Sequence, residues 1–326
     1  MINGKILITG GAGYIGSHVV RHLINEGISP SDIVIFDNLE RGNIEMIPKE
    51  VIFEKGDLQN KDDIKKIFLL NKISYVIHFA AYAYVGESMV FPEKYFENNV
   101  CGGLNLLNAM IENNVKKIVF SSSCAIYGNP KVLPIMENND KIPINPYGLS
   151  KLMFEEILKW YDKIHGMKSI CLRYFNVAGA GDGIGEKHEP ETHVIPLLIQ
   201  ASISENEFKI FGDDYKTPDG SCIRDYVHVS DLADAHYKAL NYLISKNESN
   251  QFNIGNGNGV SIFTLIKKVE EITRKKVKFV LQQRREGDPP ILTSNSTKAN
   301  EILNWKATKD INDIIKDAYL WESKKI

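Results

Sequence analysis

The fold of this chain is decided by the stretch Lys5-Ile6-Leu7-Ile8-Thr9-Gly10-Gly11-Ala12-Gly13-Tyr14-Ile15-Gly16. Residues 5–9 form a short apolar run that predicts a buried strand, and the amphipathic residues 14–26 predict a helix. The glycines between them permit a tight turn and let backbone N–H groups approach an anion, which the helix dipole also favours. This stretch therefore predicts a strand, turn and helix that bind the pyrophosphate of a dinucleotide.

Short β-branched runs recur through the first half of the chain, at residues 33–35, 75–77, 118–120 and 169–172, with amphipathic segments between them. Their continuous apolar character indicates strands that are covered on both faces. We therefore expect an α/β fold with a doubly wound parallel sheet of the Rossmann type, in an NAD-binding domain of residues 1–178.

The regular alternation ends near residue 178, and scattered elements follow around residues 195–204, 230–245, 261–274 and 311–321. We interpret residues 179–326 as a smaller C-terminal α/β lobe that binds the substrate, with some segments packing back on the first domain. Ser230 and Ser261 are the expected N-caps of two of its helices.

The composition limits the choice of partners. Lys and Arg number 39 against 41 Asp and Glu, and a net charge of −2 gives no electrostatic reason to bind nucleic acid or a membrane surface. The sequence has no apolar run of about 18 residues and no signal peptide, so a cytoplasmic protein is expected. Cys101, Cys124, Cys171 and Cys222 lack the spacing and the accompanying histidines of a metal site, which predicts buried thiols, no metal and no disulfide.

The type of dinucleotide is indicated by Asp37, which ends the second predicted strand 21 residues after Gly16. A carboxylate there can accept hydrogen bonds from both ribose hydroxyls and would repel a 2′-phosphate, which favours NAD. Arg41 keeps NADP open, because an arginine in this loop can pair with a 2′-phosphate. Asp57 has two interpretations: a contact with the adenine amino group, or the N-cap of a helix that begins near Lys61.

A candidate catalytic group lies downstream. Tyr147 and Lys151 are four residues apart, on one face of a predicted helix, and follow Ser121-Ser122-Ser123. An ammonium near the phenolic oxygen would lower a pKa that is about 10 in the free side chain. The pattern therefore predicts a tyrosine base that works near neutral pH, with hydride chemistry on the bound dinucleotide.

Further motifs occur in a fixed order at residues 9–18, 78–81, 85–88, 121–128, 145–152, 172–179, 211–215, 224–229 and 284–288. Together they resemble the extended short-chain dehydrogenase/reductase superfamily and, within it, the UDP-glucose (UDP-galactose) 4-epimerase family. The resemblance extends over nearly the whole chain.

The resemblance implies an isomerase that interconverts UDP-glucose and UDP-galactose. The C4 hydroxyl of the sugar would lose its proton to Tyr147 while its hydride passes to NAD⁺, and the 4-keto sugar would then turn and be reduced on its other face. Ser123 would share the proton, and Lys151 would also hold the nicotinamide ribose. It also implies tightly held NAD, and a homodimer in which the helices near residues 92–113 and 146–165 of both subunits form a four-helix bundle.

The resemblance implies two sets of binding residues. The cofactor set is Gly10, Gly13, Tyr14, Ile15, Gly16, Asp37, Asn38, Asp57, Leu58, Phe79, Ala80, Ala81, Ala83, Asn98, Tyr147, Lys151 and Phe175. The substrate set is Ser123, Asn176, His193, Val194, Phe211, Arg224, Arg285, Asp288 and Leu292. Arginines suit a diphosphate because they offer paired hydrogen-bond donors. Two of these residues have another interpretation: Arg224 could form a surface ion pair with Asp225, and the ring of Phe211 could belong to the core.

Three positions depart from the family pattern. Ala83 stands where some members have a lysine near the cofactor, His193 replaces an asparagine that touches the nucleotide sugar, and Leu292 replaces a tyrosine that closes the pocket. Since leucine is shorter than tyrosine, we expect the pocket to accept UDP-GlcNAc and UDP-GalNAc as well.

Other functions are weighed against this one. A 4,6-dehydratase needs an acid and a base after the serine, and Cys124-Ala125 cannot supply them. A nucleotide-sugar decarboxylase or reductase of the same superfamily, and a non-catalytic NAD-sensing protein, stay open as alternatives.

Overall fold

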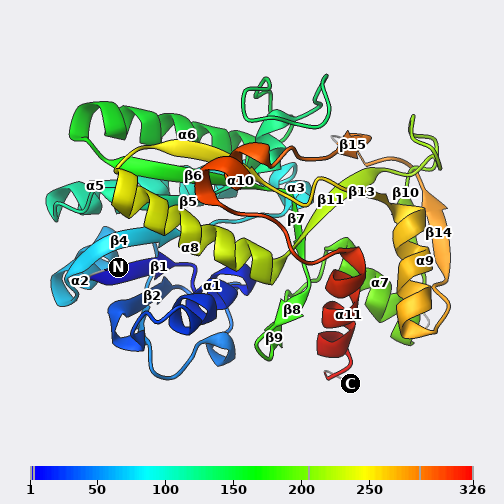
Figure 1. Ribbon diagram of the computed structural model, residues 1–326, viewed down its shortest axis with the longest axis horizontal. Helices are drawn as coiled ribbons and strands as arrows, with labels where there is room; N and C mark the ends of the chain where they lie inside the picture. The colour runs from blue at the N-terminus through cyan, green and yellow to red at the C-terminus, as the bar shows by residue number, and fades with distance from the viewer. Residues whose placement is uncertain (1, 3, 205, 286–287, 325–326) are drawn as a thin grey trace.

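The computed structural model describes residues 2, 4–204, 206–285 and 288–324, so Glu286 and Gly287 of the last motif lie outside the described residues. Its centre is a seven-stranded parallel sheet (Figure 1). In spatial order the strands are β12 (Asn250–Ile254), β6 (Lys168–Tyr174), β5 (Lys117–Ser123), β4 (Ile73–His78), β1 (Lys5–Thr9), β2 (Ile33–Asp37) and β3 (Ile52–Lys55). The doubly wound parallel sheet predicted from the apolar runs is confirmed.

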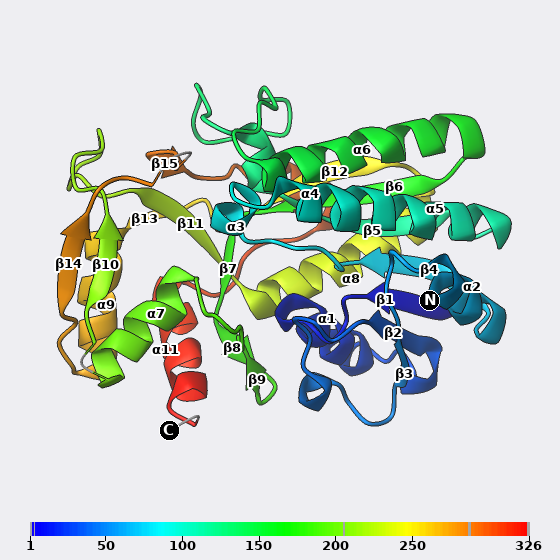
Figure 2. The same cartoon turned by 180° about the vertical axis from the view of Figure 1, so that it is seen from behind.

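Helices cover both faces of this sheet, as two buried clusters show. On one face, α1 (Tyr14–Asn25) and α8 (Val229–Lys246) contribute Val19, Leu23, Leu232 and Leu240 to the core. On the other face lie α2 (Lys61–Leu70), α5 (Gly103–Glu112) and α6 (Pro146–His165), as the view from behind shows (Figure 2). Burial on both faces explains why the strands read as continuous apolar runs.

The segment expected to be one helix at residues 92–113 is divided. It consists of α4 (Pro92–Tyr95), a π-helical segment (Phe96–Gly102) and α5. The π-helical segment places Asn99 against the loop that follows β4, where its amide exchanges hydrogen bonds with the backbone N–H and C=O of Tyr82, at 2.9 and 3.0 Å. Short helical segments complete this half: α3 (Val85–Ser88) and 3₁₀ turns at Pro30–Asp32, Ile44–Met46 and Cys124–Tyr127.

The second half of the chain supplies part of the main sheet and its cover. Strand β12 pairs with β6 at the edge of the sheet, and α8 packs along α1. Helix α10 (Thr297–Leu303) adds Ala299 and Leu303 to the same core. Segments beyond residue 178 therefore pack on the first domain, while the exact division at residues 178 and 179 stays a prediction.

The smaller lobe has its own core, built around α7 (Val194–Ser204), α9 (Ile262–Thr273) and α11 (Ile311–Glu322). Its strands are β10 (Phe208–Phe211) with β14 (Phe279–Gln282), and β11 (Ile223–His228) with β13 (Gly259–Ser261), β15 (Ile291–Leu292) and β7 (Asn176–Ala178). A short hairpin of β8 (Ala180–Gly181) and β9 (Ile184–Gly185) lies next to α11 (Figure 1). In the described part of the chain, no helix combines the length and the apolar character needed to cross a membrane.

One of the two predicted caps in this lobe is confirmed. Ser261 accepts a hydrogen bond from the backbone N–H of Thr264 at the start of α9. Ser230 is not a cap, because α8 begins one residue earlier, at Val229, and the ring of His228 accepts from the N–H of Ser230.

A buried ion pair joins α6 to the sheet. Arg173 of β6 and Glu155 of α6 are 0% and 1% exposed, and two hydrogen bonds connect them, Nε to Oε1 at 2.9 Å and Nη2 to Oε2 at 2.6 Å. Ser122 of β5 donates to the same carboxylate at 2.6 Å, and Arg173 also donates to the hydroxyl of Tyr127. Such a pair fixes geometry, since each buried charge depends on its partner.

We predict that Arg173→Met lowers the free energy of unfolding by about 3–5 kcal/mol, because it leaves the Glu155 carboxylate buried without its cation. The double variant Arg173→Met/Glu155→Leu should lose much less. Chemical denaturation measures both. The matched control is Lys159→Met, which removes the exposed Lys159–Glu156 pair of the same helix and should cost less than about 1 kcal/mol. Equal losses in the single and double variants would contradict the argument.

Candidate functional site

The glycine turn between β1 and α1 leaves no room for side chains. Gly10 has a φ of +72°, and a Cβ there would lie 2.6 Å from the backbone nitrogen of Ala80. A Cβ at Gly16 would lie 2.3 Å from the carbonyl oxygen of Gly10. No described side chain caps the N-terminus of α1, whose N-cap residue is Gly13, and its first turn has no acidic residue. The first N–H groups of this helix are thus available to an anion, as the pyrophosphate of a dinucleotide requires.

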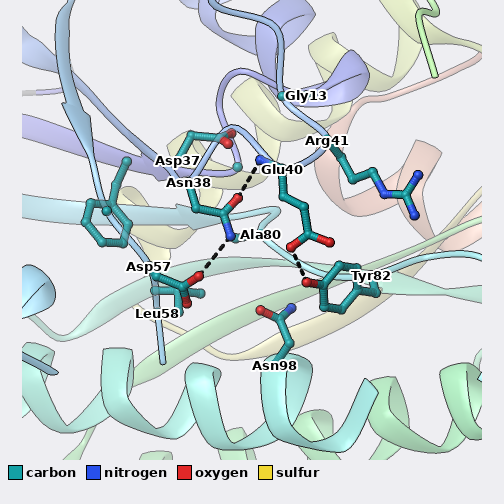
Figure 3. Close-up of a pocket in the computed structure, with 14 residues that line it drawn as sticks. Gly13, Asp37, Asn38, Glu40, Arg41, Asp57, Leu58, Ala80, Tyr82 and Asn98 are labelled. Carbon is teal, nitrogen blue, oxygen red and sulfur yellow. Dashed lines mark hydrogen bonds between the residues drawn. The ribbon is translucent and has the colours of Figure 1, made fainter. Parts of the chain in front are cut away.

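A cavity of about 100 Å³ lies next to this turn (Figure 3). It is formed by the turn and by the loops that follow β2, β3 and β4, at the carboxyl ends of the strands where nucleotides bind in such sheets. Of the predicted cofactor residues, the cavity brings together Gly10, Gly13, Asp37, Asn38, Asp57, Leu58, Ala80 and Asn98.

Asp37 is held firmly at the wall of this cavity. Its two carboxylate oxygens accept hydrogen bonds from the backbone N–H groups of Ala12, at 3.0 Å, and Leu39, at 2.9 Å. Burial raises the pKa of Asp37, and these two hydrogen bonds act in the opposite direction. Because a carboxylate offers about four acceptor positions, it can also receive the hydroxyls of a ribose.

The two interpretations of Asp57 are separated by the structure. The N-cap of α2 is Asn60, whose side chain accepts from the N–H of Asp62 at 3.0 Å, so the interpretation of Asp57 as the cap is wrong. Asp57 instead accepts from the side-chain amide of Asn38 at 2.9 Å and lines the cavity (Figure 3).

Arg41 lines the cavity but its guanidinium is engaged elsewhere. It donates to the carbonyl of Glu189 at 2.8 Å, pairs with Glu87 at 3.4 Å, and lies 4.8 Å from the ring centroid of Tyr84. With Asp37 at the cavity wall and the cation of Arg41 directed outward, the site is suited to a ribose without a 2′-phosphate.

Ser123, Tyr147 and Lys151 meet at the carboxyl end of β5. Ser123 is the last residue of β5, and Tyr147 stands in the first turn of α6, which Asn145 caps and Pro146 opens. Lys151 lies one turn later, with Nζ 5.9 Å from the centroid of the Tyr147 ring. The sequence prediction that these side chains share one site is thus matched by their positions.

Lys151 does not contact the phenol of Tyr147 here, so its predicted effect on the pKa of Tyr147 stays a prediction. Burial raises the pKa of Tyr147 to about 12, and the hydrogen bond of Ser123 opposes this only partly. Burial also lowers the pKa of Lys151 to about 7. Its ammonium donates to the carbonyl of Ser121 at 2.7 Å and not to the phenol.

The remaining predicted cofactor residues lie around the cavity without lining it: Tyr14, Ile15, Gly16, Phe79, Ala81, Ala83 and Phe175. Tyr14 has a structural bond, because its hydroxyl donates to the carbonyl of Gly179 at 2.6 Å. Phe79 packs on His236, with ring centroids 4.7 Å apart, and Phe175 is buried beside Cys124 and Ile126.

A second cavity, of about 310 Å³, lies in the smaller lobe. Four residues of the predicted substrate set line it: Val194, Phe211, Arg285 and Asp288. The guanidinium carbon of Arg285 lies 3.8 Å from the centroid of the Phe211 ring, and that ring is partly exposed, so Phe211 is not a core ring.

The alternative of a surface ion pair between Arg224 and Asp225 is also wrong. Arg224 is buried and pairs with Asp288. The carboxylate of Asp225 is buried too, and accepts from the backbone N–H groups of Asn256, at 2.8 Å, and Ser294, at 2.9 Å.

The other predicted substrate residues lie outside the lining of this second cavity. Asn176 is in β7, which pairs with β11. Leu292 is in β15, directly opposite Arg224, and packs with Ile126 and Phe175. His193 turns towards two carboxylates, with Nδ1 2.6 Å from Glu186 and 3.0 Å from Glu191.

Three of the four thiols are buried, as predicted, but Cys101 is exposed because it faces outward from the π-helical segment. All four cysteines are free. Burial raises the pKa of Cys124 to about 12, which keeps this thiol protonated next to Ser123.

Sequence reasoning missed two features of the site. Glu40 lines the first cavity and accepts a hydrogen bond from Tyr82, which lies in the run of residues 79–83 expected at the cofactor (Figure 3). The second feature is a cluster of Glu186, His188, Glu191 and His193. The spacing Glu-x-His-x-x-Glu-x-His at residues 186–193 is a sequence signal for this cluster, which contains no cysteine.

Known proteins are similar to this chain in sequence and fold. The model of the NAD dependent epimerase/dehydratase family matches residues 6–255. A UDP-glucose 4-epimerase of Streptococcus mutans is 48% identical over 98% of this chain and 96% of its own length. The crystal structure of UDP-glucose 4-epimerase from Brucella ovis in complex with NAD has a TM-score of 0.93, with 40% identity over 98% of this chain and 99% of that one. The UDP-Glc/GlcNAc 4-epimerase of Campylobacter jejuni has a TM-score of 0.85, with 38% identity over 99% and 100% of the two chains.

The sheet, the glycine turn and the group of Ser123, Tyr147 and Lys151 define a dinucleotide-binding protein of the short-chain dehydrogenase/reductase type. The chain belongs to the NAD dependent epimerase/dehydratase family. The resemblance noted in the sequence is thereby confirmed.

Proposed function

We infer that this protein is an isomerase that interconverts UDP-glucose and UDP-galactose with NAD as its cofactor. The observation that carries this conclusion is the meeting of Ser123, Tyr147 and Lys151 at the carboxyl end of β5, in a chain that aligns with UDP-glucose 4-epimerases over nearly its full length. When bound, NAD supplies an acceptor for the hydrogen at C4 of the sugar and a donor that later returns it.

The chain's own residues would manage the proton. Tyr147 would accept the proton of the C4 hydroxyl and return it after the sugar has turned, and Ser123 would share it through the hydrogen bond between the two side chains. Since burial raises the pKa of Tyr147 to about 12, a base at neutral pH needs positive charge near the phenol. Lys151 lies on the same helix face and can supply it by leaving the Ser121 carbonyl.

The residues that would hold NAD follow from the first cavity. The glycine turn and the uncapped start of α1 would bind the pyrophosphate, and Asp37 the adenosine ribose. Asn38, Asp57, Leu58, Ala80 and Asn98 would complete the wall. We propose that Tyr14, Ile15, Phe79, Ala81, Ala83, Lys151 and Phe175 act behind this wall or at the nicotinamide end.

The second cavity would take the nucleotide part of the substrate. Arg285 and Arg224 carry the positive charges suited to a diphosphate, with Arg224 giving up part of its contact with Asp288. Phe211 presents a partly exposed ring for stacking on uracil. Asn176, His193, Val194 and Leu292 would line the path of the sugar between the two cavities.

The competing functions have less support. Cys124 and Ala125, in the place of an acid and a base, give a dehydratase no group to expel water, since the Cys124 thiol stays protonated. Intact Ser123, Tyr147 and Lys151 disfavour a protein that only senses NAD. A decarboxylase or reductase would be recognised by release of CO₂ or by consumption of added NADH.

We predict that Tyr147→Phe retains bound NAD but loses epimerisation by about 10²–10⁴-fold, because only the proton acceptor is removed. Conversion of UDP-galactose without added cofactor measures activity, and release of the nucleotide on denaturation measures retention. Tyr242→Phe, which removes a phenol on α8, should behave like the parent. Full activity in Tyr147→Phe would show that another group is the base.

We also propose that UDP-GlcNAc and UDP-GalNAc are substrates, as the name of the Campylobacter jejuni relative indicates for that enzyme. Leu292 is shorter than the tyrosine that closes the pocket in some family members, and packs against Phe175 at the boundary of the two lobes. We predict that Leu292→Tyr lowers kcat/KM for the acetylated sugars at least about tenfold more than for the plain ones. Leu292→Met, which keeps the side-chain volume, should preserve the ratio. A parent protein that does not turn over the acetylated sugars would end this proposal.

We propose a homodimer that forms through α6. Leu149, Met153, Trp160 and Ile164 of this helix are 40%, 39%, 59% and 64% exposed and recur at helical spacing, which leaves an apolar stripe along it. A cytoplasmic location stays a prediction.

Light scattering should give the mass of a dimer for the parent and of a monomer for Trp160→Glu/Ile164→Glu, because two charges on the stripe oppose its burial. Leu320→Glu, at an equally exposed leucine of α11, is the control and should leave the dimer intact. A parent that is monomeric at micromolar concentration would contradict the proposal.

A further inference from the structure

The segment that joins β9 to α7 gathers two histidines and two carboxylates. The ligating atoms of Glu186, His188, Glu191 and His193 all lie within 4.8 Å of one another. His188 Nδ1 is 3.0 Å from Glu186 Oε1 and 3.9 Å from Glu191 Oε2, and His193 Nδ1 is 2.6 and 3.0 Å from oxygens of the same two residues. Two imidazole nitrogens and the oxygens of two carboxylates thus lie close together.

The separations between nitrogen and oxygen atoms are near those between the ligands of a small metal site. Zinc binds imidazole nitrogen and carboxylate oxygen at about 2.0–2.2 Å, so the ligand atoms of a tetrahedral site are about 3.3 Å apart. The four distances here, from 2.6 to 3.9 Å, scatter about that value. We propose that Glu186, His188, Glu191 and His193 form a binding site for a divalent metal ion of the zinc type.

The surroundings of the cluster suit a structural metal. The side chains of Glu186 and Glu191 are 4% and 9% exposed, and that of His188 17%, whereas His193 is 42% exposed and leaves a path for the ion to enter. Glu191 is oriented by the backbone N–H groups of residues 192 and 193, both 2.8 Å from its Oε1. Such outer contacts hold ligands in place for a metal.

Aromatic rings shield the buried side of the cluster. The rings of Tyr14 and Tyr84 meet the ring of His188 edge-on, with centroids 6.3 and 5.9 Å apart. Tyr84 also packs on His193, at 6.0 Å. An aromatic wall that excludes water from one side would strengthen the attraction between a cation and its two carboxylates.

The position of the cluster suggests what the metal would do. The same segment receives hydrogen bonds from the cofactor side, where Arg41 donates to the carbonyl of Glu189 and Asn43 to that of Lys187. From the smaller lobe, the indole of Trp321 donates to the carbonyl of Glu186 at 2.8 Å. A metal bound here would tie the wall of the cofactor cavity to the start of α7, which lines the second cavity. This inference does not depend on the proposed reaction.

The competing explanation is a network of ion pairs in which protons on the histidines satisfy the carboxylates. Both explanations use the same four side chains, but only the metal site takes up a metal ion. The two are therefore separated by measuring binding, without any substrate and without an activity assay.

The experiment uses the full chain without a histidine tag, freed of metal by a chelator that is then removed. With Zn²⁺ alone added, the parent should bind one equivalent, measured by elemental analysis after dialysis, and its Tm should rise with zinc concentration. His188→Asn and Glu191→Gln each remove one ligand and should weaken binding by more than about tenfold, with loss of the Tm increase.

The matched control is His165→Asn, which removes an exposed imidazole at the end of α6, away from the cluster, and should bind zinc like the parent. A parent that retains no zinc would overturn the proposal in favour of the ion-pair network. Binding that is equal in the parent, His188→Asn and Glu191→Gln would also overturn it, because the ion would then lie elsewhere.

Discussion

The bidentate ion pair between Arg173 and Glu155 fixes the geometry on which the rest of the structure depends. It connects β6 to the helix that carries Tyr147 and Lys151, and Ser122 of β5 donates to the same carboxylate. Three elements are thus held at one buried point, one residue from Ser123. Because a buried charge is costly without its partner, α6 cannot slide along the sheet without breaking this contact. The relative position of the serine and the tyrosine is set in this way.

The chemistry of the site follows from burial as much as from charge. Burial raises the pKa of Tyr147 and lowers the pKa of Lys151, so the neutral form of each side chain is favoured. Burial therefore opposes charge on both side chains. A cationic nicotinamide next to Tyr147 would oppose this effect of burial and favour the phenolate.

The sequence was most informative where one residue type has one physical use. The apolar runs predicted the parallel sheet, and the glycines at 10, 13 and 16 predicted the turn. Asp37 predicted one wall of the cavity. Each of these features follows from local sterics or local chemistry. Contacts between distant segments could not be predicted. The bond from Glu40 to Tyr82, the pairing of Arg224 with Asp288 and the direction of Lys151 all depend on how loops from different strands meet.

The edge strand β12 and the helix α8 determine when the chain can fold during its synthesis. Val19 and Leu23 of α1 share their core with residues of α8, which begins at Val229, and β6 pairs at the sheet edge with residues 250–254. A nascent chain leaving the ribosome must therefore keep an unfinished sheet edge and an apolar helix face exposed until Ile254 has emerged. Vectorial synthesis cannot complete the nucleotide-binding half first, and chaperones have a defined surface to protect in the interval.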